Sequence, residues 1–269
     1  MESWIKTGVV LVAMAIVALL GSWESSALMS ARGEIGPTVL QGQSPISALA
    51  AVLITLSISS VIAGIVAKYT TTISGMLVLG FALFAMAMKM AGIEAFVYGG
   101  GNVHLLILEA LFLSVVVLLA TLVVFAIGGP VKDVQQSAGP NASNFWKVLL
   151  ISLAILPVVY IIAQTPMQGQ AIGASAMGGV AIGFLARQFI PTVQPVLLYS
   201  LPIAIGGFGY FIGAMISPFS DVAFAQQEIA PLLYPMPMAY AAGIVMGVSV
   251  GLSWAVSLAE KPTTDTQVA

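Results

Sequence analysis

The stretch that decides how this chain is organised runs from Lys89 to Glu109 and reads KMAGIEAFVYGGGNVHLLILE. It joins two long apolar segments and contains the only histidine of the chain, His104. The charged residues at its two ends fall inside or at the edge of a lipid bilayer if both segments cross one. Lys89 lies ten residues before Gly99, and Glu109 lies ten residues after it. A hairpin that turns near this glycine therefore brings the two charges to a similar depth.

The composition around this stretch is that of a helical membrane protein. Of the 269 residues, 59% are hydrophobic and 7% are charged, and the mean hydropathy is +1.07. Soluble domains carry about 25% charged residues, so this chain has too few to cover a surface that faces water. The apolar runs approach the roughly 20 residues that a helix needs to cross hydrocarbon, whereas a membrane β-barrel has shorter, alternating segments. The sequence therefore predicts an all-α, polytopic transmembrane bundle.

We expect about eight transmembrane helices in this bundle. They are placed at residues 7–21, 45–67, 73–90, 103–127, 146–163, 171–186, 196–216 and 238–258. Several boundaries carry local signals: Pro45 can occupy the first position of a helix, Asn102 can cap one, and Gly129-Pro130 ends one. Pro157 predicts a kink in the fifth span. The sixth span is short and rich in glycine, so a broken helix that lines a cavity is an alternative to a simple crossing.

The spans fall into two halves. Residues 1–130 form the first four-helix half, residues 131–145 a hydrophilic cytoplasmic linker, residues 146–259 the second four-helix half, and residues 260–269 a short polar tail. With both termini in the cytoplasm, six of the eight Lys and Arg residues lie inside, which agrees with the positive-inside rule.

The halves resemble each other weakly in sequence. Gln41-Gly42-Gln43 precedes the second span and Gln168-Gly169-Gln170 the sixth, and a basic residue follows each of these two spans. Short matches of this kind also arise by chance in an apolar chain, so a 4+4 internal repeat and its absence both stay open. A true repeat would be parallel, and a shared site would lie between the halves. An alternative interpretation of the first span is a signal peptide that is cleaved off. The counterpart of this span in the second half favours a transmembrane helix that stays in the protein.

Small residues recur every fourth position in two spans of the second half. This spacing lets two helix backbones approach closely, and it predicts helix packing more readily than a sliding surface. The candidate packing residues are Ser175, Gly179, Gly183, Gly243, Gly247 and Gly251.

Glu109 and Lys89 are the candidate intramembrane charge pair, with an ion-coupling role for Glu109. Glu109 lies about 9 Å below the start of its helix, where a carboxylate must be paired, protonated or hydrated. Glu94 is a competing partner for Lys89. The alternative is that Lys89 extends to the interface, while Glu109 is neutral or bonds to a hydroxyl. His104 is a weaker candidate, because it lies about 140° around the helix from Glu109 and fits a hydrated interfacial position.

The same residues exclude several kinds of chemistry and leave two functions. The chain has no cysteine, no basic patch for nucleic acid and no paired intramembrane aspartates, and we predict no catalytic residue, cofactor or metal. The first hypothesis is a small permease or channel with a pathway between the halves. The second is a non-catalytic membrane subunit that binds other subunits or a second copy of itself. In both hypotheses the chain lies in the lipid bilayer.

The sequence leaves two structures open for residues 219–233. They form either a helix that lies in the membrane interface or an ordinary loop.

Overall fold

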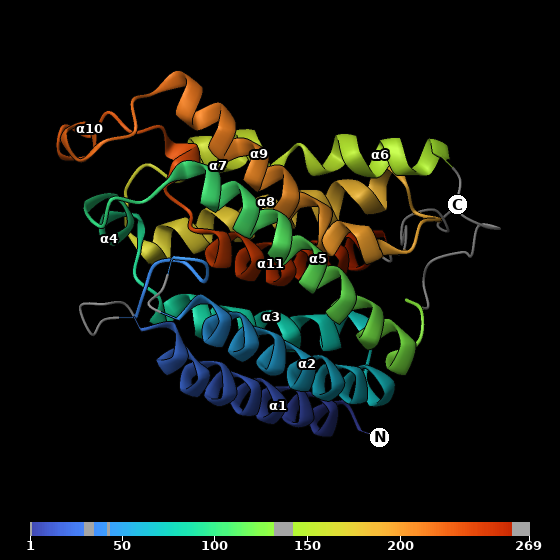
Figure 1. Cartoon of the computed structure of the whole chain (residues 1–269). Coiled ribbons are helices and arrows are strands. Elements are labelled where there is room, and N and C mark those ends of the chain that lie inside the picture. Colours follow the sequence, from blue (N-terminus) through green and yellow to red (C-terminus); the bar gives the residue numbers. More distant parts are fainter. Residues whose placement is uncertain (1, 30–34, 42–43, 132–141, 260–269) are drawn as a thin grey trace, which may run out of the picture.

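The chain forms a bundle of α-helices in a computed structural model, which describes residues 2–29, 35–41, 44–131 and 142–259 (Figure 1). The long helices are α1 (Ser3–Glu24), α2 (Pro45–Tyr69), α3 (Thr72–Lys89), α5 (Val103–Gly128), α8 (Gln168–Phe189), α9 (Leu201–Ile216) and α11 (Pro237–Ala259). The shorter ones are α4 (Ile93–Tyr98), α6 (Ala142–Ser152), α7 (Ile155–Ile162) and α10 (Asp221–Ala225). Three 3₁₀ turns add η1 (Ser25–Leu28), η2 (Pro195–Tyr199) and η3 (Pro231–Leu233). Within the described ranges the only β pairing is an isolated bridge between Met29 and Ile35, so the all-α prediction is confirmed.

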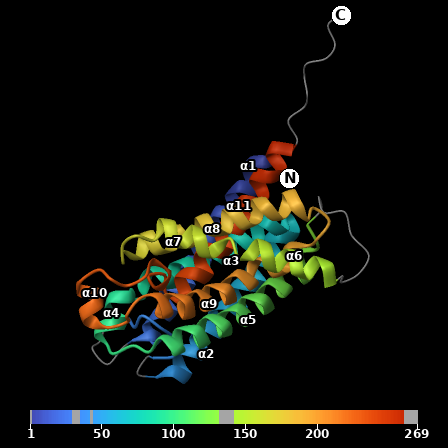
Figure 2. The ribbon, with the colours of Figure 1, turned by 90° about the horizontal axis from the view of Figure 1, so that it is seen from above.

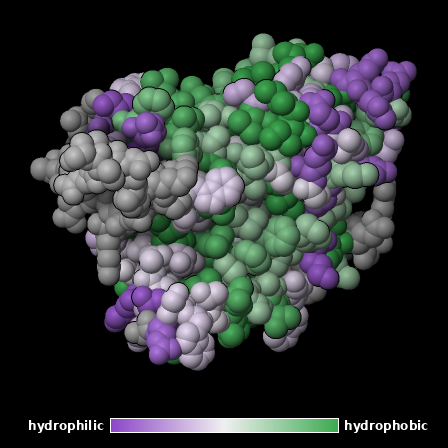
Figure 3. Space-filling view, turned by 180° about the vertical axis from the view of Figure 1, so that it is seen from behind, coloured by the Kyte–Doolittle hydropathy of each residue, from purple (hydrophilic) through white to green (hydrophobic). Residues whose placement is uncertain are grey.

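Seven segments among the described residues are long and apolar enough to cross a membrane. They are α1, α2, α3, α5, the α6–α7 segment Asn144–Ile162, α8 and α11, while α9 is apolar but has only 16 residues. The face shown in Figure 3 carries apolar residues across its middle and hydrophilic residues toward its two ends. These features identify a membrane-embedded helical protein.

The bundle has two distinct ends. α1 begins and α11 ends at one of them, which we call the terminal end (Figures 1 and 2). The short helices α4 and α10 lie at the other, which we call the α4–α10 end. Four basic residues, Lys6, Lys68, Lys147 and Arg187, belong to helix segments at the terminal end.

Local sequence explains where several helices start and stop. The Thr71 side chain accepts a hydrogen bond from the Ser74 amide at 3.1 Å, and the Asn102 side chain accepts one from the His104 amide at 2.9 Å. These bonds satisfy amides that have no partner at a helix start. Gly129 follows α5 with φ +85°, a conformation that only glycine adopts easily, and Pro130 prevents the helix from resuming.

Proline has different effects in the second half. Pro157 lies in α7, four residues after Leu153, where the chain leaves the regular helix between α6 and α7. A proline ring clashes with the carbonyl group four residues earlier, which explains the break. Pro202, by contrast, lies in the first turn of α9 and does not interrupt it.

Three sequence expectations need correction. The sixth span is not a short broken helix, because α8 continues without interruption through 22 residues and its first turn takes in Gln168-Gly169-Gln170. The seventh span is shorter than expected, because η2 forms its first turns. Residues 219–233 do not form one interfacial helix: α10 ends at Ala225 and a turn leads into η3. The predicted tail, residues 260–269, and most of the predicted linker, residues 132–141, lie outside the described residues.

The most buried long helix is α11, which packs against α8, α3, α5 and α9. In the first half α3 packs on α1 and α2, and α2 also packs on α5; α5 in turn packs on α9. α11 therefore joins both halves into one core.

Candidate functional site

The Glu109 carboxylate is completely buried and is bound by backbone amides. The side chain is 0% exposed. The Val39 amide lies 3.0 Å from both carboxylate oxygens, and the Leu40 amide donates to one of them at 3.1 Å. Hydrogen bonds to a charged group are stronger than those between neutral groups, so these amides can compensate part of the cost of burying a carboxylate.

The amides come from the described part of the α1–α2 connection, residues 35–41, which we call the cradle loop. Its Thr38 and Val39 side chains are buried. The Gly36 amide donates to the Leu28 carbonyl group at 2.7 Å, and the Ala91 amide donates to the Ile35 carbonyl group at 3.2 Å. The cradle loop is thus fixed at both its start and its centre, and Glu109 is the side chain that anchors the centre.

The other charged candidates lie elsewhere. Lys89 is the last residue of α3 and is exposed, and Glu94 is exposed on α4. No ion pair joins Lys89 to Glu109 or to Glu94 in the part of the chain that the structure describes. His104 is exposed in the first turn of α5, on a different face from the buried Glu109. The structure therefore leaves Lys89 at the surface, as in the alternative to the charge pair, and brings Glu109 to backbone amides, which neither alternative predicted.

The six candidate packing residues lie where α8 and α11 meet. A Cβ atom added at Gly179 would come within 2.8 Å of the Ile244 carbonyl oxygen, and one added at Gly183 within 2.6 Å of the Val248 carbonyl oxygen. From α11, Gly243 faces Ser175, while Gly247 and Gly251 face the backbone of Ala176 and Val180. The two backbones are in direct contact along this seam, which leaves no room for a solute between them.

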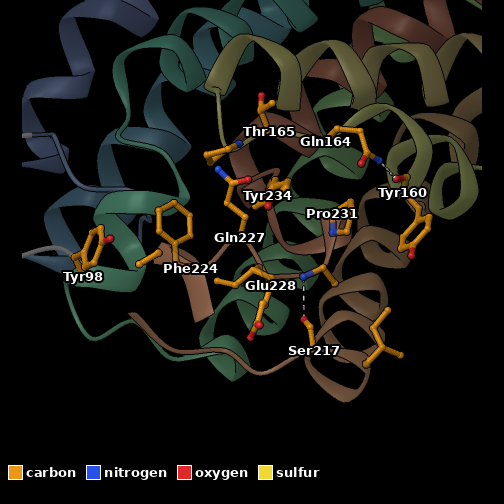
Figure 4. Close-up of a pocket in the computed structure, with 15 residues that line it drawn as sticks. Tyr98, Tyr160, Gln164, Thr165, Ser217, Phe224, Gln227, Glu228, Pro231 and Tyr234 are labelled. Carbon is orange, nitrogen blue, oxygen red and sulfur yellow. Dashed lines mark hydrogen bonds between the residues drawn. The ribbon is translucent and has the colours of Figure 1, made fainter. Parts of the chain in front are cut away.

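A pocket of about 700 Å³ opens at the α4–α10 end (Figure 4). Its lining comes from α4, the end of α7, the end of α9, α10 and the segment that follows α10. The lining residues are Tyr98, Tyr160, Gln164, Thr165, Pro166, Ile216, Ser217, Phe224, Ala225, Gln227, Glu228, Ile229, Ala230, Pro231 and Tyr234. Four of them are aromatic, and Glu228 is the only one with a formal charge at neutral pH. Partial burial raises the pKa of the Tyr234 hydroxyl above its usual value, so this group stays neutral.

The aromatic side chains lie on opposite sides of this pocket. In Figure 4, Tyr98 and Phe224 lie together on one side, Tyr160 lies on the other, and Gln227 and Glu228 lie between them. The rings of Tyr98 and Phe224 meet edge to face, with centroids 5.6 Å apart. This contact ties α4 of the first half to α10 of the second.

Gln227 has an unusual backbone conformation. Its φ is 59°, the only positive φ of a non-glycine residue in the described ranges. The Glu228 amide donates to the Ala223 carbonyl group at 2.9 Å, which closes the turn after α10 in the manner that helices usually achieve with glycine. A side chain at this position costs about 1–2 kcal/mol. Backbone strain of this kind tends to mark functional sites, and here the strained residue lines the pocket.

Replacing Gln227 with glycine is expected to leave the fold intact and to raise the free energy of unfolding by about 0.5–1 kcal/mol, because glycine relieves the strain. Gln226→Gly is the matched control: Gln226 has φ −85°, so glycine gains nothing there and a loss of stability is expected. Unfolding of both variants in mixed detergent micelles measures the difference. A Gln227→Gly variant that is less stable than the control would show that the side chain is needed for folding.

Two buried tyrosines bind the segment that contributes Pro231 and Tyr234 to the pocket. The Tyr210 hydroxyl donates to the Pro235 carbonyl group at 2.6 Å, and the Tyr240 hydroxyl lies 3.4 Å from the Leu232 carbonyl group. Their rings meet edge to face with centroids 5.7 Å apart, and both side chains are 0% exposed. We call them the tyrosine pair.

Glu109 lies at about the same depth in the bundle as this pair. Gly207 of α9 lies against Ala110 and Ile107 of α5, so Glu109 is level with Gly207. Tyr210 follows Gly207 by three residues in the direction of the pocket, and Ser217 at the pocket follows by ten, which is about 15 Å along a helix. The Tyr240 ring lies against Gly206, one residue before Gly207, so Tyr240 and Glu109 lie at a similar depth below the pocket.

Sequence reasoning missed the cradle loop and the pocket for different reasons. The partners of Glu109 are backbone amides 69 and 70 residues away. Almost every residue has a backbone amide, so residue types cannot identify which amides bind Glu109. The pocket is assembled from five segments, and the sequence signal available was the run of aromatic and polar residues after α9. Glutamine pairs such as Gln226-Gln227 gave no indication of a positive φ.

No group of three or more His, Cys, Asp or Glu side chains suited to a metal ion is present in the described residues. Comparisons of the chain with models of protein families, with curated proteins and with solved structures found no match. The chain's own geometry must therefore carry any functional proposal.

Proposed function

We propose that this protein is a small permease whose pathway lies between its two halves and opens at the α4–α10 pocket. The observation that carries the proposal is the position of this pocket: it lies at the end of an apolar bundle, its walls combine α4 of the first half with α7, α9 and α10 of the second, and a buried carboxylate lies beneath it. Transporter sites lie between structural halves in many folds.

Glu109 is the proposed coupling group. A buried carboxylate within a membrane span is costly, and such residues usually serve ion or proton movement. Its described hydrogen bonds all come from the cradle loop, so protonation would weaken the hydrogen bonds that hold the Val39 and Leu40 amides of this loop. A change of charge at Glu109 is thereby linked to the strength with which the cradle loop is held.

We further propose eight crossings and a 4+4 parallel repeat. Under this repeat α3 corresponds to α9 and α5 corresponds to α11. A twofold axis along the membrane normal would convert the α3–α11 contact into an α9–α5 contact. Both contacts are present, and they are the two main contacts between the halves. Within the halves, the α2–α5 contact corresponds to the α8–α11 contact. These exchanges support the repeat independently of the short sequence matches, although α2 packs on α3 whereas α8 has no comparable contact with α9.

We propose that the terminal end faces the cytoplasm. Lys6, Lys68, Lys147 and Arg187 lie toward this end, whereas Lys89 is the one described basic residue at the other. This distribution follows the positive-inside rule.

A flux experiment tests the permease. Proteoliposomes that contain the purified chain are offered labelled amines, zwitterions and sugars, and uptake by wild type is compared with uptake by Glu109→Gln. We expect uptake of at least one solute and at least a tenfold loss in the variant, because a neutral amide cannot exchange a proton. Glu94→Gln, an exposed change on α4, is the matched control and should transport like wild type.

The second candidate function is a non-catalytic subunit of a membrane complex. The observation that favours it is the full satisfaction of Glu109 by backbone amides, together with its absence from the lining of the described pockets. A wild-type protein that transports none of the solutes, and that is always purified from its own membranes with the same partners, would replace the permease with this function.

A further inference from the structure

We propose that the α4–α10 pocket is a binding site for a small organic cation, such as a primary or quaternary amine. This inference rests on the proposed function in one respect only: it names the substrate class that a permease with this opening would take. The site itself is argued from the pocket's charge and shape.

The first argument is charge. Glu228 is the one formally charged residue that lines the pocket, and it is exposed. Two further acidic residues, Glu94 on α4 and Asp221 on α10, lie on helices that pack against each other at the same end. Lys89 is the single basic residue described there. The local field therefore attracts cations and repels anions.

The second argument is the aromatic wall. Tyr98 and Phe224 lie on one side of Glu228 and Tyr160 lies on the other (Figure 4). Tyr98 and Tyr160 are each 48% exposed, so their rings are accessible. Ammonium groups bind to the faces of aromatic rings within about 6 Å of the ring centre. Aromatic rings around one carboxylate can bind an alkylated ammonium group more strongly than a carboxylate alone, which competes poorly with water for such a group.

The third argument is the strain at Gln227. This residue keeps a side chain at a backbone position suited to glycine, and the side chain lies in the middle of the pocket (Figure 4). Its amide can accept a hydrogen bond from an N–H or O–H group of a ligand and can donate one to a hydroxyl. The pocket volume of about 700 Å³ lies in the usual range of sites for small organic ligands.

The test measures binding to the full chain in lipid nanodiscs by calorimetry. The probes are ethanolamine, tetramethylammonium and choline, together with 3,3-dimethyl-1-butanol, a neutral molecule with the shape of choline. We expect at least one cation to bind, and the neutral isostere to bind at least tenfold more weakly than choline or not at all. Equal affinity for choline and the isostere would overturn the proposal, as would the absence of binding by all three cations.

Variants then locate the site. Glu228→Gln and Tyr98→Leu are each expected to weaken cation binding about fivefold, and Tyr98→Phe should restore it because the ring is retained. Gln227→Gly should weaken binding without a loss of stability. Glu2→Gln, an exposed change just before α1 at the terminal end, is the matched control and should bind within about twofold of wild type. Unchanged affinity in both Glu228→Gln and Tyr98→Leu would place the cation elsewhere and overturn the proposal.

The outcomes for this site and for the permease are separable. Cation binding in nanodiscs without uptake into proteoliposomes would remove the transport function and keep the site. Uptake of a neutral solute by a protein that binds no cation would keep the permease and overturn the cation site.

Discussion

Replacement of Glu109 with leucine is expected to lower the free energy of unfolding by roughly 2–5 kcal/mol, although leucine has a similar volume and suits a membrane span. The change leaves the Val39 and Leu40 amides without their acceptor in a buried site, and each buried donor without a partner costs about 1–3 kcal/mol. Unfolding in mixed micelles measures the loss. A variant as stable as wild type would show that these amides find water or another acceptor.

The cradle loop itself gives a second measurement for this prediction. The chain has no cysteine, so a single Val39→Cys substitution adds one thiol at a position that is 0% exposed. A maleimide reagent should label this thiol slowly when Glu109 is present and much faster when Glu109→Leu is added. Glu94→Leu serves as the control, because Glu94 is exposed and makes no described contact with the loop. Equal labelling rates in both backgrounds would mean that Glu109 does not hold the loop.

Replacement of Gly247 with alanine is expected to cost about 3 kcal/mol, the largest effect of a single methyl group in the described chain. The added Cβ would overlap the Ala176 carbonyl oxygen, a backbone atom that cannot rotate away, so α8 and α11 would have to separate along their shared seam. Gly173→Ala in α8 is the matched control, since no atom lies within 4 Å of the added methyl group. It should be as stable as wild type or up to about 1 kcal/mol more stable.

The comparison of the two alanine variants in mixed micelles also separates packing from helix propensity. Alanine favours a helix over glycine at both positions, so a difference between the variants reports the helix contact alone. A Gly247→Ala variant that matches Gly173→Ala would show that the α8–α11 seam can open without cost.

The helical fold was predictable because its signals are local. Apolar length marked the spans, Asn102 marked the start of α5, and Gly129-Pro130 marked its end. The seam between α8 and α11 was also visible, because small residues at every fourth position lie on one face of a helix. The length of α8 was underestimated, since its first turn is polar and resembles a loop.

The arrangement of the helices was not predictable to the same degree. In water, the apolar face of a helix identifies the side that is buried. In a bilayer, lipid and protein are equally apolar, and α5 illustrates the result: Leu106 and Leu113 are buried, whereas Leu108 and Leu111 are about half exposed. The residue types on the two faces are the same. Glu109 could therefore be recognised as important, but its partners depended on which face met which loop.

The central position of α11 has a consequence for biogenesis. A ribosome makes α3, α5, α8 and α9 before α11, yet each of these helices packs against it. Until α11 enters the membrane, the glycine-lined face of α8 has only lipid or another protein beside it, and α3 lacks its main contact with the second half. The α5–α9 contact can join the two halves earlier, but the core is complete only with the last described helix. A chain stalled before Pro237 would expose the faces of α3 and α8 that α11 covers.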